Sequence, residues 1–501
     1  MFSHSREPSS STIQDSGGRL FRQPRLAFEG KNKQGQSHHD ALAATLLLAT
    51  LAACGGGAPD VTGRGEAFAG LVTAEEPRAA AVARDVLATG GNAADAAVAL
   101  AFTLTVTYPV SAGLGGGGVC LVADPKNRKE VQSLEFLPRF PREPAGGEAV
   151  PALSRGLLAL HARHGQTPWG SLVMPAEILA RTGSVVSRAL ARALAAMENS
   201  AFENKGLRTL FAKPDGTWVG EGEGIVQPEL AHTLAHLRLH GLFHEGEAAR
   251  ALATVTAGGG PPTVDDSRGD LRGDLPRWQA ARAVPFGYAA AYFVPSPTGH
   301  EEMASTWAGF AANGFDDSSV TDRIHLAQAF RAVPKGHSTG FIVADHTGRT
   351  VACTLTLNDP VRGQKPVTGG ATLRDMEPML IVKRNVPEVV LAGTIAGGTG
   401  AVLLPLAAQL VFGTGSLDTI LAAPRIDGGP DGVLVEKTAP ARWVQEVRAH
   451  IPTAKPTPRE VDTLGRVTLL WCPESLPPAP ATCQIATDPR GHGLAMVVKK
   501  R

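Results

Sequence analysis

The sequence predicts a layered α+β fold, and three features of the chain lead to this prediction. Stretches typical of β-strands occur both early and late in the chain, and the part between them is mostly helical. The chain has 501 residues and is 43% hydrophobic, so it can bury a large core. Its 57 glycines and 37 prolines indicate many turns and close backbone contacts. This order of elements favours layers of sheet and helix over a regular βαβ array.

The N-terminal segment is predicted to lie outside this fold. Residues 1–40 are polar, and we expect a disordered extension or a segment upstream of the true start. Residues 41–54 form an apolar run that is too short to cross a bilayer and suits a signal-peptide core. The run ends in LAAC, a glycine-rich tether follows at 55–65, and together they resemble a bacterial lipobox with Cys54 as the lipidated residue. A short buried helix is the alternative interpretation.

After the tether, the first predicted elements are two helices and a strand. An amphipathic helix is expected in TAEEPRAAAVARDVLATGG, and Gly90 and Gly91 end it. Asn92 caps a second helix, NAADAAVALAFTLTVTYP, which is apolar on nearly every face and should be buried. The stretch GLGGGGVCLVAD then leads into a strand. Residues 154–250 are mostly helical, and residues 255–300 are rich in Gly and Pro with short strands.

The C-terminal part of the chain begins with a helix and a hairpin. The helix is RIHLAQAFRAV, and the hairpin is GHSTGFIVADHTGRTVACTLTLN, residues 336–358. A strand MLIVK, a glycine-rich turn AGTIAGGTG and a buried helix AVLLPLAAQLVF follow. Late strands are expected around VTLLW and CQIATD.

Charge and motif content exclude several classes of function. The net charge is +1, from 48 basic and 47 acidic residues, and no basic run is present that would follow a phosphate backbone. We therefore expect no nucleic-acid partner. The sequence contains no CxxC, HExxH or His-rich cluster, so neither a metal site nor a cofactor is predicted.

The cysteines beyond Cys54 fall into two pairs. Cys120 and Cys353 lie in apolar, strand-like runs, and we expect them to be buried thiols. Cys472 and Cys483 flank a proline-rich loop. In an oxidising compartment these two could form a disulfide, and the sequence leaves open whether they do.

The hairpin at 336–358 collects hydroxyl side chains at its open end. Ser338 begins the first strand, and Thr356 ends the second. The turn DHTGR centres near Thr347, and pairing about this centre places Ser338 opposite Thr356, to within one residue of register. A plain hairpin with threonines at positions that favour strands is the alternative.

A hydroxyl at such a position needs a base before it can act as a nucleophile. His337 adjoins Ser338, but neighbouring residues of a strand point to opposite faces. Cleavage of the bond before Ser338 would free its α-amine. With a pKa near ~8, this amine is partly neutral at physiological pH and can serve as the base.

Several stretches resemble the γ-glutamyltransferase (γ-glutamyltranspeptidase) family of N-terminal-nucleophile hydrolases. The most specific is VLATGGNAADAAVALAFTLTVTYPVSAGLGGGGVCLVAD, residues 86–124. HGQTPWGSLVMPAEILARTG, IAGGTG, APRID and ATDPRGHGLA resemble further segments of the family, and the similarity extends over residues 66–498. The resemblance implies a four-layer αββα fold and self-cleavage before the nucleophile. It also implies acyl transfer from glutathione or another γ-glutamyl compound to water or an amine, without a cofactor.

The resemblance also implies roles for individual residues. Ser338 takes the place of the nucleophile, which is usually Thr, and Thr356 that of the hydroxyl that bonds it and assists self-cleavage. Asn358 matches a polar residue on the substrate side. Gly397 and Gly398 match the backbone donors of the oxyanion hole, and their place before a helix suits that role.

The glycine block at 115–118 has a second interpretation, a loop that binds phosphate. We reject it because a strand follows the block, whereas a phosphate loop opens a helix with Lys and Ser or Thr.

The sequence departs from the family pattern at the substrate-binding positions. Leu137 stands where the family has an Arg that holds the α-carboxylate, and Arg139 or Arg142 could substitute. The stretch NDPVRGQKPVTGGATLRDMEP is too short to hold the family's lid and its amine-binding Asp. Arg374 and Asp375 align with the family's carboxylate-binding serines, and they can bind a zwitterion or each other. Gly340 replaces the His that commonly follows the two hydroxyls.

These observations predict a periplasmic, lipid-anchored precursor. Its large-subunit region would be 66–337 and its small-subunit region 338–501, so that each is the other's partner. A γ-glutamyl compound with water or an amine would be the small-molecule substrate, and the lipid anchor would be the one contact with a membrane. The alternatives are an amidohydrolase of the same fold with another acyl donor, and a non-catalytic periplasmic scaffold that has lost processing.

Overall fold

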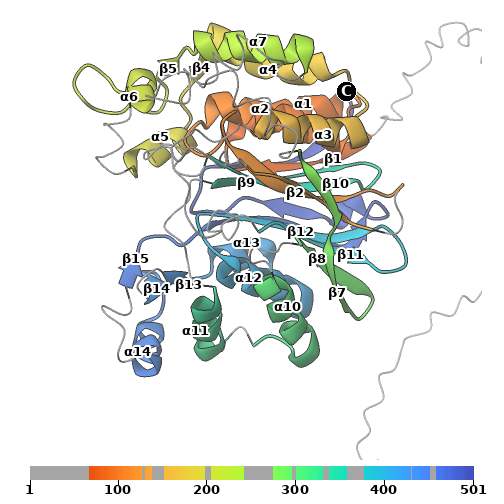
Figure 1. Cartoon of the computed structure of the whole chain (residues 1–501). Coiled ribbons are helices and arrows are strands. Elements are labelled where there is room, and N and C mark those ends of the chain that lie inside the picture. Colours follow the sequence, from red (N-terminus) through yellow and green to blue (C-terminus); the bar gives the residue numbers. More distant parts are fainter. Residues whose placement is uncertain are drawn as a thin grey trace, which may run out of the picture. The chain divides into compact units, whose positions relative to one another are not determined.

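The computed structural model describes residues 67–126, 130–137, 152–197, 205–241, 275–295, 301–316, 318–330, 338–357, 377–429, 432–451 and 459–501. All of them belong to a unit that runs from Arg64 to Arg501. Two antiparallel sheets lie face to face in this unit, and helices cover the outer face of each (Figure 1). The predicted α+β class and the αββα order of layers are confirmed. The expected extension, signal segment and tether at 1–65 lie outside the described residues.

In the described part of the chain, the first sheet has seven strands in the order β18-β1-β9-β10-β2-β3-β6. Their bounds are β1 Phe68–Ala74, β2 Gly117–Ala123, β3 Gln132–Phe136, β6 Arg277–Ala280, β9 Ser338–Asp345, β10 Thr350–Thr356 and β18 Leu494–Lys499. The helices on its outer side are α1 Pro77–Ala88, α2 Ala93–Thr107, α3 Leu153–His164, α4 Trp169–Thr182, α5 Arg188–Ala195, α6 Lys205–Phe211 and α7 Pro228–His240. The short strands β4 Ser184–Val185 and β5 Gly224–Ile225 pair within this layer.

The second sheet has six strands within the described residues, in the order β17-β16-β12-β11-β8-β7. Their bounds are β7 Arg282–Phe286, β8 Ala289–Phe293, β11 Met379–Lys383, β12 Val389–Ala396, β16 Arg466–Leu476 and β17 Gln484–Ala486. Its outer side carries α10 Glu301–Asn313, α11 Val320–Ala329, α12 Gly400–Phe412 and α13 Leu417–Ala422. A small sheet of β13 Ile426–Gly429, β14 Gly432–Glu436 and β15 Arg459–Val461 lies beside α14 Ala441–His450, and a 3₁₀ turn covers Pro480–Thr482.

Helix α2 shows how local sequence builds the first helical layer. Its N-terminus is a capping box, in which the Asn92 side chain accepts from the backbone of Asp95 and the Asp95 carboxylate accepts from the backbone of Asn92. All of its side chains are buried, as the apolar residues on nearly every face predict.

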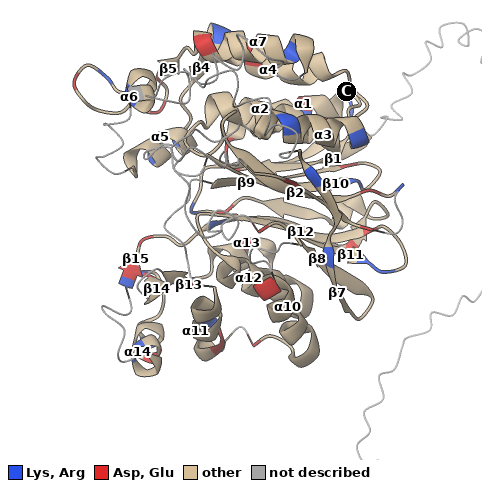
Figure 2. Ribbon diagram, in the orientation of Figure 1, with Lys and Arg blue, Asp and Glu red and all other residues tan. Residues whose placement is uncertain are grey.

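In Figure 2 the charged residues lie mostly on the outer helices and in loops, and the strands of the two sheets carry few of them.

The hairpin of β9 and β10 lies in the middle of the first sheet and is covered on both faces. Phe341 and Val343 point into the core shared with the helices, and Ile342 and Ala344 point into the core between the sheets. Strands that are buried on both faces are hydrophobic in nearly every position. This explains why apolar side chains fill most of the hairpin, whereas the hydroxyls of Ser338 and Thr356 at its open end are buried polar groups.

The predicted register of this hairpin is confirmed. Ser338 is paired with Thr356, and Ala344 with Thr350. The turn between the strands contains Gly348 with a φ of +89°, a conformation that favours glycine. The proposed large- and small-subunit regions are therefore interleaved in one sheet, because β9, β10 and β18 alternate with β1 and β2.

The expectation that Cys120 and Cys353 are thiols is wrong. Both are fully buried, as predicted, but they form a disulfide between β2 and β10. The two residues are directly opposite in the antiparallel pair, and the sequence pattern of neither strand reveals this pairing. Cys472 and Cys483, whose state the sequence left open, form a second disulfide.

Near the open end of the hairpin, Gly340 packs closely against the second sheet. A methyl group built on Gly340 would lie 2.3 Å from Oγ1 and 2.9 Å from Cβ of Thr394, on strand β12 of the other sheet. Both residues are fully or nearly fully buried, so the neighbour has little room to move. A His at this position could not coexist with Thr394 in this arrangement.

We expect the change Gly340→Ala to lower the free energy of unfolding by about 1–3 kcal/mol, because overpacking forces the sheets apart. Thermal or chemical denaturation measures this loss. The matched control is Gly224→Ala in strand β5, where an added methyl group meets no atom within 4 Å. Equal stability of the two variants would contradict the close packing of the sheets at Gly340.

Candidate functional site

Ser338, Thr356 and Gly397 come together at one end of the central strands. Ser338 is the first residue of β9, is 2% exposed and lies directly opposite Thr356 in β10. The backbone N–H of Gly397, from the end of β12 in the other sheet, donates a hydrogen bond of 3.2 Å to Ser338 Oγ. A hydroxyl that faces a backbone N–H donor is the arrangement that acyl transfer by a Ser nucleophile requires.

The turn after β12 presents its backbone toward Ser338. Gly397 has a φ of +66°, which favours glycine, and Thr399 is the N-cap of α12. The Thr399 side chain accepts from the backbone N–H of Ala401, and the Gly397 N–H before it is directed at Ser338. The N-terminus of a helix favours negative charge, so Gly397 and Gly398 lie where an oxyanion could be bound.

The side chain of Asp427 holds the turn at Gly397 and Gly398 in place through hydrogen bonds. Its carboxyl accepts hydrogen bonds from the Thr399 backbone at 3.2 Å, from Thr399 Oγ1 at 2.5 Å and from the Gly428 backbone at 2.8 Å. Burial raises the pKa of Asp427 to about 6. The sequence identified Asp427 only as part of the APRID motif and gave it no role.

A buried ion pair holds a neighbouring turn that is in contact with the Gly397–Gly398 turn. Arg425 and Asp488 are 2.6 Å apart and both are almost fully buried. Arg425 Nη1 also donates to the carbonyls of Leu464 and Gly465, at 3.1 Å each. A methyl group on Gly398 would lie 2.9 Å from Cα of Gly465, so the two turns are in contact. The ion pair thereby fixes the surface on which the Gly397–Gly398 turn rests.

Glu75 and Arg466 form a second charged pair beside Ser338. Arg466 Nη2 lies 3.2 Å from Glu75 Oε2 and donates to the Ser338 carbonyl at 3.4 Å. Burial raises the pKa of Glu75, and the negative charge of Glu75 raises the pKa of Arg466. The sequence gave no signal for this pair, because the two residues lie 391 positions apart in the chain and neither belongs to a recognised motif.

The glycines at 115–118 allow two strands to pack closely. A methyl group on Gly116 would lie 2.2 Å from the Thr356 carbonyl oxygen, and one on Gly118 would lie 2.7 Å from that of Thr354. Strand β2 begins within the block, at Gly117, which agrees with the rejection of a phosphate loop. The block lets β2 approach β10 closely at the end where Thr356 lies.

Of the other residues that the sequence analysis named for the substrate side, Leu137 is described. Leu137 packs against the apolar core between the two sheets, so its position carries no charge. Asn358, Arg374, Asp375 and Cys54 lie outside the described residues. Among the described residues, no group of His, Cys, Asp or Glu could hold a metal ion.

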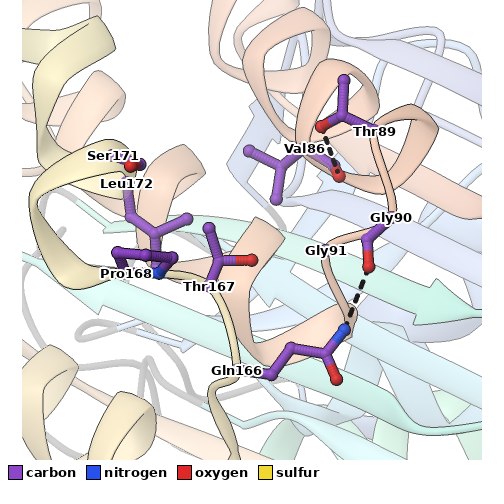
Figure 3. Close-up of a pocket in the computed structure, with 9 residues that line it drawn as sticks. All are labelled: Val86, Thr89, Gly90, Gly91, Gln166, Thr167, Pro168, Ser171 and Leu172. Carbon is purple, nitrogen blue, oxygen red and sulfur yellow. Dashed lines mark hydrogen bonds between the residues drawn. The ribbon is translucent and has the colours of Figure 1, made fainter.

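A pocket of about 460 Å³ lies in the outer helical layer (Figure 3). Gly90 and Gly91 line one wall, and Gln166 and Thr167 line another. Helix α2 starts next to this pocket. The backbone N–H of its first residue, Ala93, donates a hydrogen bond to the carboxylate of Asp345, which is the last residue of β9, whereas Ser338 is the first. Since β9 rises by about 3.3 Å per residue, this pocket is remote from Ser338 and is not part of the candidate site.

Comparison with known proteins gives consistent results. The family model "Gamma-glutamyltranspeptidase" matches residues 79–269. Glutathione hydrolase 3 of Arabidopsis thaliana is 32% identical over 216 residues, which cover 40% of this chain and 34% of that protein. A glutathione hydrolase proenzyme of Bacillus subtilis (strain 168) is 31% identical over 299 residues, 52% of this chain and 49% of that protein. The chain thus spans about a third to a half of the length of these relatives.

The fold is shared with a solved structure over most of the chain. The crystal structure of a cephalosporin acylase from Bacillus halodurans matches with a TM-score of 0.66 at 20% identity. The match covers 87% of this chain and 97% of the other. At this identity the likeness establishes the common αββα fold.

The raised pKa of Asp427 predicts a pH dependence of stability. Its folded pKa of about 6 exceeds the value near 4 of an unfolded chain. This group therefore contributes a stability that is fully present below about pH 4 and is lost as the pH rises through about 6. The variant Asp427→Asn cannot titrate there. We expect the stability of the wild type relative to this variant to fall by roughly 2–3 kcal/mol between about pH 4 and pH 7.

Melting curves of both proteins across this pH range measure the effect. The exposed carboxylate of Asp418, changed to Asn, is the control and should show a much smaller change. A stability of the wild type relative to Asp427→Asn that rises with pH would contradict the assignment.

Proposed function

The chain belongs to the γ-glutamyltranspeptidase family, and on this premise we propose that it is a self-cleaving amide hydrolase or transferase that acts on γ-glutamyl compounds. The observation that carries the proposal is the contact of Ser338 Oγ with the Gly397 N–H, directly opposite Thr356. In this proposal the nucleophile and its supporting hydroxyl come from two strands of the first sheet, and the oxyanion donor comes from the turn after β12 in the second.

Self-cleavage comes first in this proposal. Ser338 Oγ attacks the carbonyl carbon of His337, and the bond from that carbon to the Ser338 nitrogen breaks. The resulting ester is hydrolysed by water, which leaves a carboxylate on His337 and a free hydroxyl and α-amine on Ser338. We assign Thr356 as the hydroxyl that hydrogen-bonds to Ser338 and assists this step.

The processed chain then transfers an acyl group. The α-amine of Ser338 takes the proton of its own hydroxyl, and Oγ attacks the amide carbonyl of the donor. The oxyanion is bound by the backbone of Gly397 and Gly398, and the proton passes to the leaving amine. Water or an amine then releases the acyl group from Oγ. The scheme needs no cofactor.

The substrate side of the site is assigned from the family pattern. We propose Asn358 as a polar substrate contact, and Arg374 and Asp375 as partners for the charges of a zwitterion. The apolar surroundings of Leu137 support an alternative in which the donor's acyl group lacks the full set of γ-glutamyl contacts. A scaffold that does not process itself is the reading that the active-site contacts favour least.

We propose a periplasmic protein that is anchored through a lipid on Cys54. Two disulfides support an oxidising compartment, since such bonds are rare in reducing ones. No helix in the described part of the chain is both long enough and apolar enough to span a membrane.

The first prediction of this proposal is processing at one bond. Purified protein should give two fragments on a reducing gel, and the smaller one should begin at Ser338. A smaller fragment that begins at Thr339 would move the nucleophile by one residue, and a single intact chain would favour the scaffold.

Two variants separate the nucleophile from its supporting hydroxyl. Ser338→Ala should abolish both processing and turnover, because the attacking oxygen is lost. Thr356→Ala removes one hydrogen bond, worth about 1 kcal/mol, and should slow processing by about fivefold to tenfold. The rates follow from gels sampled over time. Turnover by Ser338→Ala would refute the mechanism.

A third prediction concerns the acyl donor. We expect weak turnover of γ-glutamyl anilides with a high KM, and comparable turnover of glutaryl anilides, which lack the α-amine. Arg374→Ala should lower kcat/KM for both donors about tenfold or more, because a carboxylate partner is lost. A strong preference for γ-glutamyl that survives the Arg374 change would show that the substrate pocket has been assigned to the wrong residues.

The last prediction concerns the anchor. Cys54→Ser should move the protein from the membrane fraction to the soluble periplasmic fraction. A cytoplasmic chain that keeps Met1 would refute the lipobox interpretation.

A further inference from the structure

Arg466 reaches the nucleophile from the start of β16. It pairs across the sheet with Ala396, the residue just before Gly397. Its Nη2 bonds the Ser338 carbonyl, and a methyl group on Gly397 would lie 3.7 Å from its Nη1. The guanidinium is therefore beside both the nucleophilic residue and the turn proposed to bind the oxyanion.

Glu75 holds this guanidinium in one orientation. The carboxylate follows the last residue of β1 and is buried. A carboxylate removed from water is stable as an anion only beside a cation or several donors, and Arg466 is its ion-pair partner. Two long side chains that would otherwise sample many rotamers are thereby fixed at the site.

The guanidinium keeps donors available for another group. Nη2 serves Glu75 and Ser338, while Nε is buried and no described residue accepts a hydrogen bond from it. Nη1 likewise has no acceptor among the described residues. The side chain remains 31% exposed, so a ligand can reach it. A planar guanidinium with free N–H groups is suited to bind a carboxylate.

The position that holds an arginine in the family pattern is apolar here. Leu137 packs in the core between the sheets and can pair with no charge. A donor that carries a carboxylate on its acyl chain therefore needs a cation from elsewhere in the site. Arg466 supplies one in direct contact with Ser338.

We propose that Arg466, oriented by Glu75, binds the carboxylate of the acyl donor. This assignment rests on the proposed function and names a specificity residue for it. The preferred donors would then be amides of dicarboxylic acids whose second carboxylate lies a few carbons from the reacting carbonyl.

The test compares glutaryl anilide with pentanoyl anilide, in which a methyl group replaces the carboxylate. Arg466→Met should lower kcat/KM for the glutaryl donor by about 10–100-fold, mainly through KM, and change the pentanoyl value by less than about threefold. Arg466→Lys keeps the positive charge but lacks the planar guanidinium, so its kcat/KM for the glutaryl donor should lie between those of the wild type and Arg466→Met. The Lys variant is used in place of Arg466→Met if the latter does not fold. Arg282→Met, which breaks an exposed ion pair on β7, is the matched control.

Equal losses for the two donors would overturn the assignment, because they would show that Arg466 only positions Ser338. Calorimetric titration of each variant with glutarate and with pentanoate gives a readout that does not need turnover. Glutarate binding that depends on Arg466 supports the assignment even in a protein that neither processes itself nor turns over. Normal turnover with glutarate binding unchanged in Arg466→Met refutes the assignment and leaves the proposed function standing.

The disulfide between Cys120 and Cys353 carries a second, independent inference. The two residues are 233 positions apart and lie on opposite sides of the proposed cut between His337 and Ser338. Cys472 and Cys483 both lie after the cut. We infer that the two fragments of the processed protein remain covalently joined, an inference that rests on the proposed self-cleavage.

Gels with and without reductant test this tether. Protein denatured with a thiol-blocking reagent should run as one band without reductant and as two with it. The variant with both Cys120→Ala and Cys353→Ala should give two bands in either case, and the variant with both Cys472→Ala and Cys483→Ala should behave as the wild type.

Two wild-type bands without reductant would overturn the tether. One band under both conditions would refute processing instead. In that case mass spectrometry of a tryptic digest still tests for the disulfide. A pair of peptides linked through Cys120 and Cys353 would support the disulfide, and separate alkylated peptides would refute it.

Discussion

The pairing of β9 with β10 is the constraint on which the rest of the site depends. It places Ser338 opposite Thr356, at the end of strands that are buried on both faces. Because side chains alternate along a strand, a slip of one residue would turn the Ser338 hydroxyl from the space between the sheets to the helical side. The buried apolar positions of both strands oppose such a slip, so the hydrophobic core itself fixes the position of the hydroxyl.

The second sheet completes the site through buried polar contacts. In the proposed mechanism, the turn at Gly397 and Gly398 keeps its N–H groups oriented before any charge develops, since preorganised donors are what stabilise an oxyanion. Asp427 holds the turn from one side, and the Arg425–Asp488 pair holds the neighbouring turn at Gly465. Burying these charges is costly unless each finds its partners, and this explains why they form one connected cluster.

The two regions on either side of Ser338 cannot act separately. Glu75 comes from the first region, and Arg466, Gly397 and Ser338 come from the second, yet they meet at one point. Strands of the two regions are interleaved within the first sheet, and the Cys120–Cys353 bond crosses the same boundary. A cut at Ser338 would therefore free an amine in place without dividing the core.

The sequence by itself determined those features that depend on neighbours along the chain. The capping box at Asn92, the register of the hairpin and the place of Gly397 before a buried helix follow from periodicity, turn residues and helix-start signals. The tertiary structure alone decided which distant segments meet. Glu75 and Arg466 are 391 positions apart, and Asp427 of β13 meets Thr399 at the start of α12. Such pairs follow from how strands and helices are arranged in space, and hydrophobic patterning specifies which face of an element is buried without specifying which element lies beside it.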